Sequence, residues 1–404
     1  MNYEYDYDAV VVGAGPAGSI CAKYLAENNI KVLVVDKKQE IGTPKRCGEM
    51  IAIDGLCDAG LEVNPIWAVN EVYGLELYPP DANKKINLKW NEPIGYILER
   101  KIFEKHLAYD AIRAGAKYMV KTRATEVTRD DNGKISGIRA EFMGDEIIIK
   151  AKLIIAADGV DSKIAKSAGI KTTNDLKDYE PGFQYEMAGL KNIDPNILQL
   201  YFGKETVPHG YIWIFPKGCG IANVGIGVDC MIAEKQGKRP KDYLDEFLKK
   251  NPGIFKDASP IEINTGGIPV SGGLDEFVFD NLIILGDAAQ QVNPITGGGI
   301  STAMRSGRLA AEVAAKAIKE GDLSKERLKE YEDRWKKSYE HKMKMALRVR
   351  LFAQKLSDDE LNKLAGLLNR DDVMRLLDGE YGFLVKRLIL KAPQLLPIAR
   401  KILV

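Results

Sequence analysis

The sequence predicts an α/β fold in which a domain built on a parallel sheet is interleaved with a mostly antiparallel sheet and followed by a helical region. Two segments predict the parallel sheet, because residues 7–12 and residues 281–285 each read as a buried strand that runs into a glycine-rich turn. A third segment, PHGYIWIFPKG, alternates aromatic residues between prolines and predicts a short strand of the other sheet. The 404 residues are too many for one simple core, so we expect two or three domains.

The overall composition is that of an ordinary globular protein, with 45% apolar and 28% charged residues. A formal net charge of +1 argues against a nucleic-acid partner. The five cysteines form no CxxC pair and no iron–sulfur spacing, which is typical of reduced thiols in a cytosol, and we expect no metal site. No apolar run approaches the roughly 18 residues of a membrane span, and the N-terminus lacks the layout of a secretory signal. We therefore expect a cytoplasmic protein, with peripheral contact to a membrane left open.

The first glycine-rich turn predicts a nucleotide site. It reads GAGPAG, stands between the first strand and a helix, and is followed by a second strand that ends at Asp36. Gly13 permits the tight turn, Gly15 lets the backbone approach a pyrophosphate, and Gly18 lets the helix pack closely on the strand. The pyrophosphate is expected at the helix N-terminus and the ribose hydroxyls at Asp36. This pattern is typical of a Rossmann-type domain.

The second glycine-rich segment indicates which nucleotide is bound. A strand ends at Gly286 and Asp287, and glycines at 297–299 open a long helix that begins near Ile300. The segment resembles the second flavin motif of the FAD-dependent aromatic hydroxylase superfamily. That resemblance implies that Asp287 binds the ribityl chain and that Gly297, Gly298 and Gly299 lie against the isoalloxazine. A helix N-terminus also stabilises the negative charge that develops on a flavin during reduction.

A third match lies in IIAADGVDSKIAKSAG, at residues 154–169. Asp158, Gly159 and Ser162 fit the DGxxSxxR pattern of the same superfamily, but Ala165 stands where the pattern has arginine. In the hydroxylases this motif contributes to both FAD and NADPH binding. The departure argues against NADPH binding here, and the segment is otherwise a strand-to-helix turn of the FAD domain.

The remaining motifs resemble those of the geranylgeranyl reductase family, and within it the archaeal reductases of digeranylgeranylglycerophospholipids. They are RCGE in the loop after Asp36, LER at residues 98–100 and PxxYxWxFP at residues 208–216. With the FAD motifs they occur in family order over essentially the whole chain. The resemblance implies FAD as cofactor, a polyprenyl ether lipid as substrate, and reduction of its C=C bonds by hydride from N5 of reduced FAD. It also implies FAD contacts at Ala17, Arg46, Cys47, Gly48, Met50, Arg100, Ala124 and Ile300.

The aromatic strand is a candidate substrate wall. Tyr211, Trp213 and Phe215 fall on one face of a strand, and a prenyl chain offers only apolar surface to such rings. His209, in the turn before the strand, is expected on the substrate side as well. Plain core packing of the three rings is the alternative, and the sequence leaves it open.

An isolated alkene needs a proton as well as a hydride, so a proton donor is expected near the flavin. Cys47 in the RCGE loop is the first candidate for a catalytic residue, and Tyr211 is the second. The alternative for Cys47 is that its thiol only lines an apolar pocket, since a free cysteine is commonly a small buried hydrophobe.

The predicted domains are discontinuous. We assign residues 1–72, 98–172 and 277–325 to the FAD-binding domain, and residues 73–97 and 173–276 to the substrate domain. Residues 326–404 form a C-terminal helical region that begins with a long charged helix. Its last segment, FLVKRLILKAPQLLPIARKILV, mixes aliphatic residues with cations, and it can either lie on an anionic membrane or pack on the protein.

The sequence leaves several partners open. We expect a monomer that takes electrons from an external donor, which could be NADPH, ferredoxin or a deazaflavin. The rival enzyme functions are an FAD-dependent monooxygenase and a quinone-linked electron-transfer flavoprotein dehydrogenase. The non-enzyme rival is a lipid carrier that contains flavin.

Overall fold

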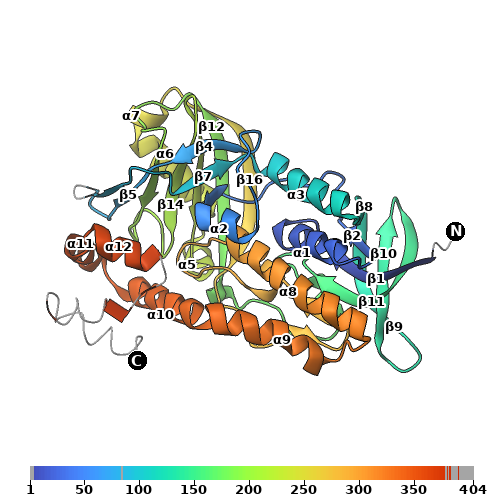
Figure 1. The fold of residues 1–404 in the computed structure, drawn as a ribbon. Coiled ribbons are helices and arrows are strands. Elements are labelled where there is room, and N and C mark those ends of the chain that lie inside the picture. The colour runs from blue at the N-terminus through green and yellow to red at the C-terminus, as the bar shows by residue number, and fades with distance from the viewer. Residues whose placement is uncertain (1–3, 83–84, 378–379, 381, 384–389, 391–404) are drawn as a thin grey trace.

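The computed structural model describes residues 4–82, 85–377, 380, 382, 383 and 390. Figure 1 shows two sheets beside each other, with α8, α9 and α10 running beneath both. The amphipathic segment predicted at the end of the chain lies, apart from a few positions, outside the described residues. Within those residues, no helix is both long and apolar enough to span a bilayer.

The first sheet is centred on parallel strands, as predicted. β1 (Glu4–Val12) pairs in parallel with β2 (Val32–Val35) and with β11 (Asp145–Ala156). The parallel order continues through β8 (Lys117–Met119) on one side and β18 (Leu282–Ile284) on the other. Because parallel strands end at one edge of a sheet, the turns that follow β1, β2, β11 and β18 all gather there.

Antiparallel strands complete the first sheet at two places. β17 (Val278–Phe279) pairs with β18, and a hairpin of β9 (Thr122–Arg129) and β10 (Ile135–Phe142) extends from β11. The short helix α4 (Lys163–Ser167) follows β11.

Three helices pack around the glycine-rich turns of this sheet. α1 (Pro16–Glu27) packs on both α8 (Ile300–Glu320) and α3 (Arg100–Ala114). The contact with α8 is close: a Cβ on Gly307 would lie 2.3 Å from the carbonyl oxygen of Ala17. Residues far apart in the sequence, Ala17 and Gly307, therefore meet at the start of α1.

The second sheet has seven strands in the order β16-β12-β15-β14-β13-β5-β6. Its neighbours are antiparallel except β13 and β5, which are parallel. The strands are β5 (Gly74–Tyr78), β6 (Ile86–Lys89), β12 (Tyr179–Ala188), β13 (Ile197–Tyr201), β14 (Tyr211–Gly218), β15 (Ile221–Gly227) and β16 (Ser259–Pro269). The sheet and its order confirm the predicted mostly antiparallel part of the α/β fold. The aromatic strand is longer than expected, because β14 includes Pro216 and ends at Gly218.

One face of the second sheet is covered by its own helices. α5 (Cys230–Gln236), α6 (Pro240–Lys250) and α7 (Pro252–Phe255) follow β15, and Leu244 and Phe247 pack with Ile212 and Ile214 of β14 in one buried cluster. The opposite face carries the aromatic side chains and is turned toward the first sheet. A small third sheet, β3 (Met50–Ala52), β7 (Gly95–Leu98) and β4 (Ala68–Val72), lies between the two with α2 (Ile53–Asp58).

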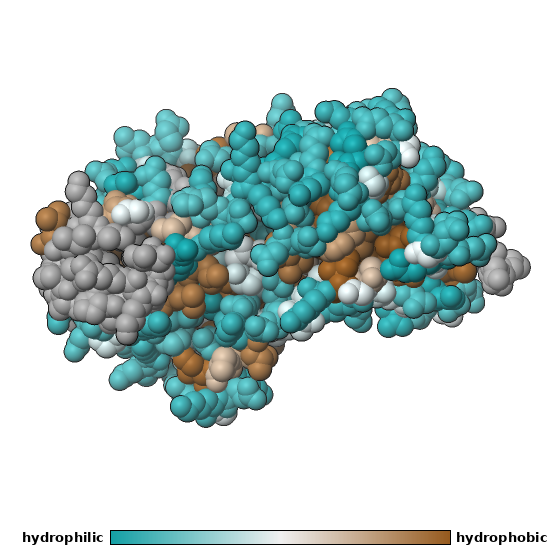
Figure 2. All heavy atoms as spheres, turned by 90° about the horizontal axis from the view of Figure 1, so that it is seen from below, coloured by the Kyte–Doolittle hydropathy of each residue, from teal (hydrophilic) through white to brown (hydrophobic). Residues whose placement is uncertain are grey.

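The predicted long charged helix is interrupted. α9 (Lys325–Trp335) leads into a π-helical turn at Lys336–Glu340 and then into α10 (His341–Lys355). The shorter α11 (Asp358–Leu367) and α12 (Arg370–Leu377) follow. Figure 2 shows the molecule from the side on which α9 and α10 lie, and this face is mostly hydrophilic with apolar side chains in several separate areas.

Candidate functional site

The GAGPAG turn has the geometry that a phosphate-binding turn requires. Gly13 has a φ of +106°, and a Cβ there would lie 2.2 Å from the carbonyl oxygen of Ala157. A Cβ on Gly18 would lie 1.9 Å from the carbonyl oxygen of Gly13, so only glycine allows α1 to pack this closely. A Cβ on Gly15, by contrast, would meet nothing within 4 Å. There is open space beside the N-terminus of α1, where backbone N–H groups can bind an anion, and the turn therefore fits a dinucleotide pyrophosphate.

Asp36 lies directly beside this turn. Its Oδ2 accepts a hydrogen bond from the N–H of Ala14 at 2.8 Å, and its Oδ1 accepts from the N–H of Lys38, also at 2.8 Å. Each carboxylate oxygen keeps a second acceptor position, so the predicted contact with ribose hydroxyls is compatible with these bonds. The N–H of Thr122 donates to the carbonyl of Asp36 at 2.8 Å, which brings β9 and the buried Ala124 alongside.

The second glycine motif meets the first in space. Gly286 opens a 3₁₀ turn with a φ of +60°, and a Cβ there would lie 3.1 Å from the Cβ of Ala17. Asp287 follows, and its Oδ1 lies 3.3 Å from the place where a Cβ on Gly299 would stand. Burial raises the pKa of Asp287, while the nearby Arg100 acts in the opposite direction. The two motifs thus form one site.

The DG motif supplies an acceptor without a protein partner. Asp158 follows β11, and its Oδ2 accepts from the N–H of Ile164 at 3.0 Å. Its Oδ1 is buried and has no partner among the described residues. Gly159 has a φ of +75°, and Ser162 donates to the carbonyl of Ala288 at 3.4 Å. A buried carboxylate oxygen without a donor fits a site that a ligand completes. The residues at the edge of the first sheet therefore fit FAD.

The RCGE loop brings Cys47 to Arg100. The Sγ of Cys47 accepts a hydrogen bond from the N–H of Glu49 at 3.1 Å, and the guanidinium of Arg100 lies near the same thiol. Arg100 is held in turn by Glu104, whose Oε1 accepts from its Nε at 2.6 Å. Burial alone would lower the pKa of Arg100, but Cys47 and Glu104 raise it above its usual value. The resemblance implies an FAD contact for Arg100, and the structure brings this residue close to Cys47 and Asp287.

The other predicted residues of this loop lie against the second and third sheets. A Cβ on Gly48 would lie 2.9 Å from Cε2 of Phe215, so the loop passes directly over the aromatic strand. The exposed Arg46 crosses Gly266 of β16, where an added Cβ would lie 3.3 Å from the Cβ of Arg46. Met50 begins β3. The loop therefore lies between the edge of the first sheet and the open face of the second.

The aromatic side chains of β14 share one face, as predicted. The ring centroids of Tyr211 and Trp213 are 5.8 Å apart, and those of Trp213 and Phe215 are 6.2 Å apart. Tyr211 and Phe215 are half-buried, but Trp213 is only 8% exposed. Its indole lies across Gly225 of β15, where an added Cβ would come within 2.2 Å of Cζ2.

Tyr211 connects the aromatic strand to the glycine loop of the first sheet. Its hydroxyl donates to the carbonyl of Thr296, and a Cβ on Gly297 would lie 4.0 Å from that hydroxyl oxygen. Burial raises the pKa of Tyr211, with Glu180 acting in the same direction. His209 lies at the same end of the strand, with its Nδ1 3.5 Å from Oδ2 of Asp229.

The sequence did not indicate the buried polar residues beneath the RCGE loop. Glu49 is fully buried with a φ of +74°, and its Oε2 accepts from Lys45 at 3.0 Å and from Lys217 at 3.1 Å. Gln184 in β12 and Asn223 in β15 are buried beside them. The only signal in the sequence was that these two amides occupy strand positions of the face that also carries Trp213, where apolar residues are usual.

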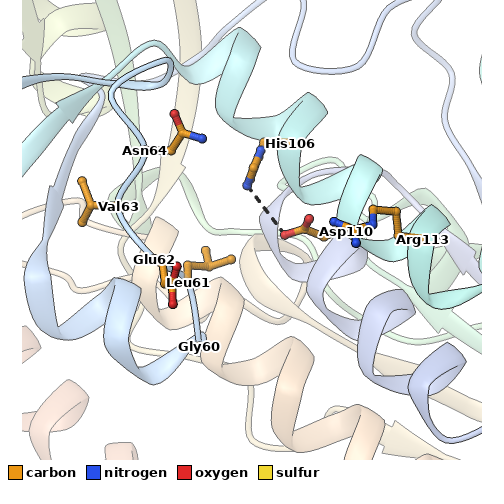
Figure 3. A pocket seen from close by; sticks show the side chains of 8 residues that line it. All are labelled: Gly60, Leu61, Glu62, Val63, Asn64, His106, Asp110 and Arg113. Atoms are coloured by element: carbon orange, nitrogen blue, oxygen red, sulfur yellow. Dashed lines mark ion pairs between the residues drawn. The ribbon is translucent and has the colours of Figure 1, made fainter.

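A surface groove elsewhere contains none of the predicted residues. It has a volume of about 330 Å³ and lies between the 60–64 segment and α3. Figure 3 shows His106 pointing toward Asp110, with Nε2 and Oδ2 3.8 Å apart. Its lining is largely polar and charged, which does not suit a prenyl chain. Among the described residues, no group of histidine, cysteine and carboxylate side chains has the arrangement of a metal site.

Comparisons with known proteins cover almost the whole chain. Residues 178–268 match the model of the geranylgeranyl reductase catalytic domain, and residues 6–197 match that of an FAD binding domain. The digeranylgeranylglycerophospholipid reductase of Methanocaldococcus jannaschii is 44% identical over 98% of each chain. Digeranylgeranylglycerophospholipid reductase 1 of Methanothermobacter thermautotrophicus is 41% identical over 97% of each chain.

Solved structures show the same fold. A geranylgeranyl bacteriochlorophyll reductase-like protein from Thermoplasma acidophilum superimposes with a TM-score of 0.91 at 35% identity, over 99% of this chain and 100% of that one. A flavin-dependent brominase reaches a TM-score of 0.73 at 20% identity, over 93% of this chain and 94% of its own, and this similarity concerns the fold alone.

Proposed function

Because this chain belongs to the geranylgeranyl reductase family, and within it to the digeranylgeranylglycerophospholipid reductases, we propose that the site between its two sheets saturates the prenyl chains of an archaeal-type ether lipid. The chain is an FAD-dependent oxidoreductase that acts on the C=C bonds of geranylgeranyl lipids. One observation carries the proposed location. The aromatic strand β14 touches the flavin motif at one end, through Tyr211 and Thr296, and the Cys47 loop at the other, through Phe215 and Gly48.

The residues that would hold FAD come from the first sheet. The GAGPAG turn and Asp36 would bind the pyrophosphate and the ribose, and Asp158 would offer its free Oδ1. Asp287 and the glycines at 297–299 would lie at the ribityl chain and the ring. When bound and reduced, FAD supplies the hydride for one carbon of the double bond.

Cys47 is the residue we assign to the proton of the other carbon. Its sulfur already accepts a hydrogen bond from the N–H of Glu49, and the guanidinium of Arg100 lies near it. The S–H hydrogen therefore points away from this N–H donor, and the N–H and the nearby guanidinium both favour the thiolate that remains after the proton has moved to carbon. Tyr211 fits this role less well, because its hydroxyl donates to Thr296 and burial raises its pKa.

The prenyl chain would lie along the open side of the aromatic strand. Tyr211 and Phe215 are half-buried and keep apolar surface for it, while Trp213 packs between them. Rings of this size exclude water without needing polar partners from the substrate. His209 would lie at the end of the wall nearest to Tyr211.

Further partners complete the proposal. An external donor has to reduce the flavin in each cycle, and NADPH, ferredoxin and a deazaflavin are all candidates; Ala165 in place of the motif arginine speaks against NADPH. We also propose a cytoplasmic monomer with peripheral contact to the membrane that contains its substrate. The monooxygenase, electron-transfer and carrier alternatives give way to the reductase function, because the relatives that match nearly the whole chain are reductases.

Mass spectrometry of the lipid tests the function without the natural electron donor. Dithionite-reduced protein is incubated with a digeranylgeranylglycerophospholipid, and the product should gain one hydrogen pair for each bond reduced. Free FAD reduced by dithionite serves as the control. An unchanged lipid mass with FAD-loaded, reduced protein would refute the proposal.

A further inference from the structure

Two buried amides connect the aromatic strand to the Cys47 loop. Gln184 is 3% exposed and Asn223 is not exposed at all. The Oε1 of Gln184 accepts from the indole N–H of Trp213 at 2.8 Å, and its Nε2 donates to the carbonyl of Cys47 at 3.0 Å. Because an indole N–H can only donate, it fixes which way the Gln184 amide points.

Asn223 extends the connection along the same loop. Its Oδ1 accepts from Gln184 at 3.1 Å, and its Nδ2 donates to the carbonyl of Gly48 at 3.2 Å and to Oε2 of Glu49 at 2.7 Å. Each of the three consecutive loop residues from Cys47 to Glu49 is therefore bonded to one of the two amides. Through the N–H of Glu49, the same bonds also fix a donor to the Cys47 sulfur.

The two amides stand where a sheet face would ordinarily be apolar. Gln184 faces Gly225 across the strands, and Gly225 faces Trp213, so the three positions form one row on the same side of the sheet. Leu or Val there would fill the space but would leave the indole N–H and the Cys47 carbonyl without partners. Buried polar groups in such a row destabilise the fold unless they have hydrogen-bond partners, and here the loop that carries the thiol supplies those partners.

We propose that Gln184 is a positioning residue, which sets the distance between the indole of Trp213 and the main chain of Cys47. A prenyl chain that lies on β14 would then present its double bond at a fixed place relative to the thiol. The inference rests on the proposed function of Cys47. Proton transfer to carbon needs the donor in position, and a misplacement of about 1 Å can lower a rate by roughly 100-fold.

The substitution Gln184→Met tests this role, because methionine keeps the length of the side chain and removes its hydrogen bonds to Trp213, Cys47 and Asn223. We expect FAD content to be retained, KM for the lipid to change little and kcat to fall about 10- to 100-fold. A second measurement does not depend on activity: the rate at which iodoacetamide alkylates Cys47, mapped by peptide mass spectrometry. That rate should change, while the rates at the exposed Cys57 and Cys219 should not.

The matched control is Gln199→Met. Gln199 is a buried glutamine of the same sheet, 6% exposed, and its side chain makes two hydrogen bonds, one with Glu76 and one with Tyr201. It pairs with Ile214 and so faces away from Trp213. If the effect of Gln184→Met is purely structural, both variants should be less stable than the parent, and the rate of Cys47 alkylation should be the same in both.

Two further variants keep the test decisive. Gln184→Glu retains an acceptor for the indole but cannot donate to Cys47 when ionised. If Gln184→Met fails to fold, Gln184→Glu takes its place in the test and should show the same fall in kcat and the same change in Cys47 alkylation. Trp213→Phe removes the indole N–H, and Gln184→Met should then lower kcat by a smaller factor than in the parent. Unchanged kcat and Cys47 alkylation in Gln184→Met would overturn the inference. Parent protein that reduces no lipid would refute the proposed function, whereas the alkylation result would still judge the positioning role.

Discussion

Gly225 offers a direct test of how the aromatic strand is packed. In the substitution Gly225→Ala the new Cβ would lie 2.2 Å from Cζ2, 2.4 Å from Cε2 and 2.9 Å from Nε1 of Trp213. Ordinary carbon contacts are about 3.5–4.0 Å, so the indole has to move by roughly 1 Å or more. Moving it would also break its hydrogen bond to Gln184.

The sign of the stability change is informative. Alanine in a strand interior is favoured over glycine by about 0.5–1 kcal/mol, because glycine loses more backbone entropy on folding. Overpacking a well-filled site costs about 1–3 kcal/mol, so we expect a net loss of about 1–2 kcal/mol in the free energy of unfolding. In a Trp213→Leu background the ring is absent, and Gly225→Ala should become neutral or slightly stabilising.

The parent, the two single variants Gly225→Ala and Trp213→Leu, and the double variant form a double-mutant cycle. They can be compared by denaturant unfolding of the FAD-loaded form and by turnover of the long-chain lipid. Gly225→Ala should lower turnover in the parent and have little effect in the Trp213→Leu background. Equal destabilisation in both backgrounds, or a stabilising effect in the parent, would show that the indole does not lie on Gly225.

Three other outcomes follow from the site. Heating the yellow protein should release FAD, identified by chromatography, and FMN or a flavin retained in the precipitate would contradict the assignment. Cys47→Ala should keep FAD but slow or shorten saturation of the lipid, whereas parent rates for every bond would mean that Cys47 only packs. Burial acts to raise the pKa of Glu186, but Lys45 and Lys217 lower it below its usual value. The stability it contributes is therefore complete above the unfolded pKa of about 4.3 and is lost as the pH falls through the folded pKa. Glu186→Gln should weaken the dependence of stability on pH below that value. Denaturant midpoints that fall with decreasing pH as steeply in the variant as in the parent would contradict this.

The FAD half of the site could be predicted because its information is local. A strand, a glycine turn and a helix follow one another in GAGPAG, and the second motif repeats that order at Gly286 and Asp287. Parallel strands bring such turns to one edge, so the meeting of Gly286 with Ala17 follows from the topology. The same reasoning did not place Arg100 beside Cys47, because LER identifies a helix start and not the direction of its first side chain.

The buried polar residues could not be predicted, since their partners come from separate strands and from one loop. The charged side chains of Lys45, Glu49 and Lys217 are at most 6% exposed, although such residues are usually exposed, and nothing local marks them as buried. Their burial depends on the pairing of β12, β14 and β15 and on the loop that crosses them. The π-helical turn at Lys336–Glu340 could not be predicted either, because the surrounding sequence reads as one uninterrupted charged helix.

The packing of Trp213 differs from that of its two neighbours in the aromatic pattern. A spacing of two predicts three equivalent rings, but the rings are not equivalent: Trp213 is enclosed by Gly225, Gly48 and Gln184, while Tyr211 and Phe215 keep open surface. An indole held on a glycine and by a hydrogen bond can hardly change position, so it suits a fixed support more than an adaptable contact. The flanking rings can then meet the chain, and the support connects them through Gln184 to the thiol. We therefore expect core packing from Trp213 and substrate contact from the two rings that flank it.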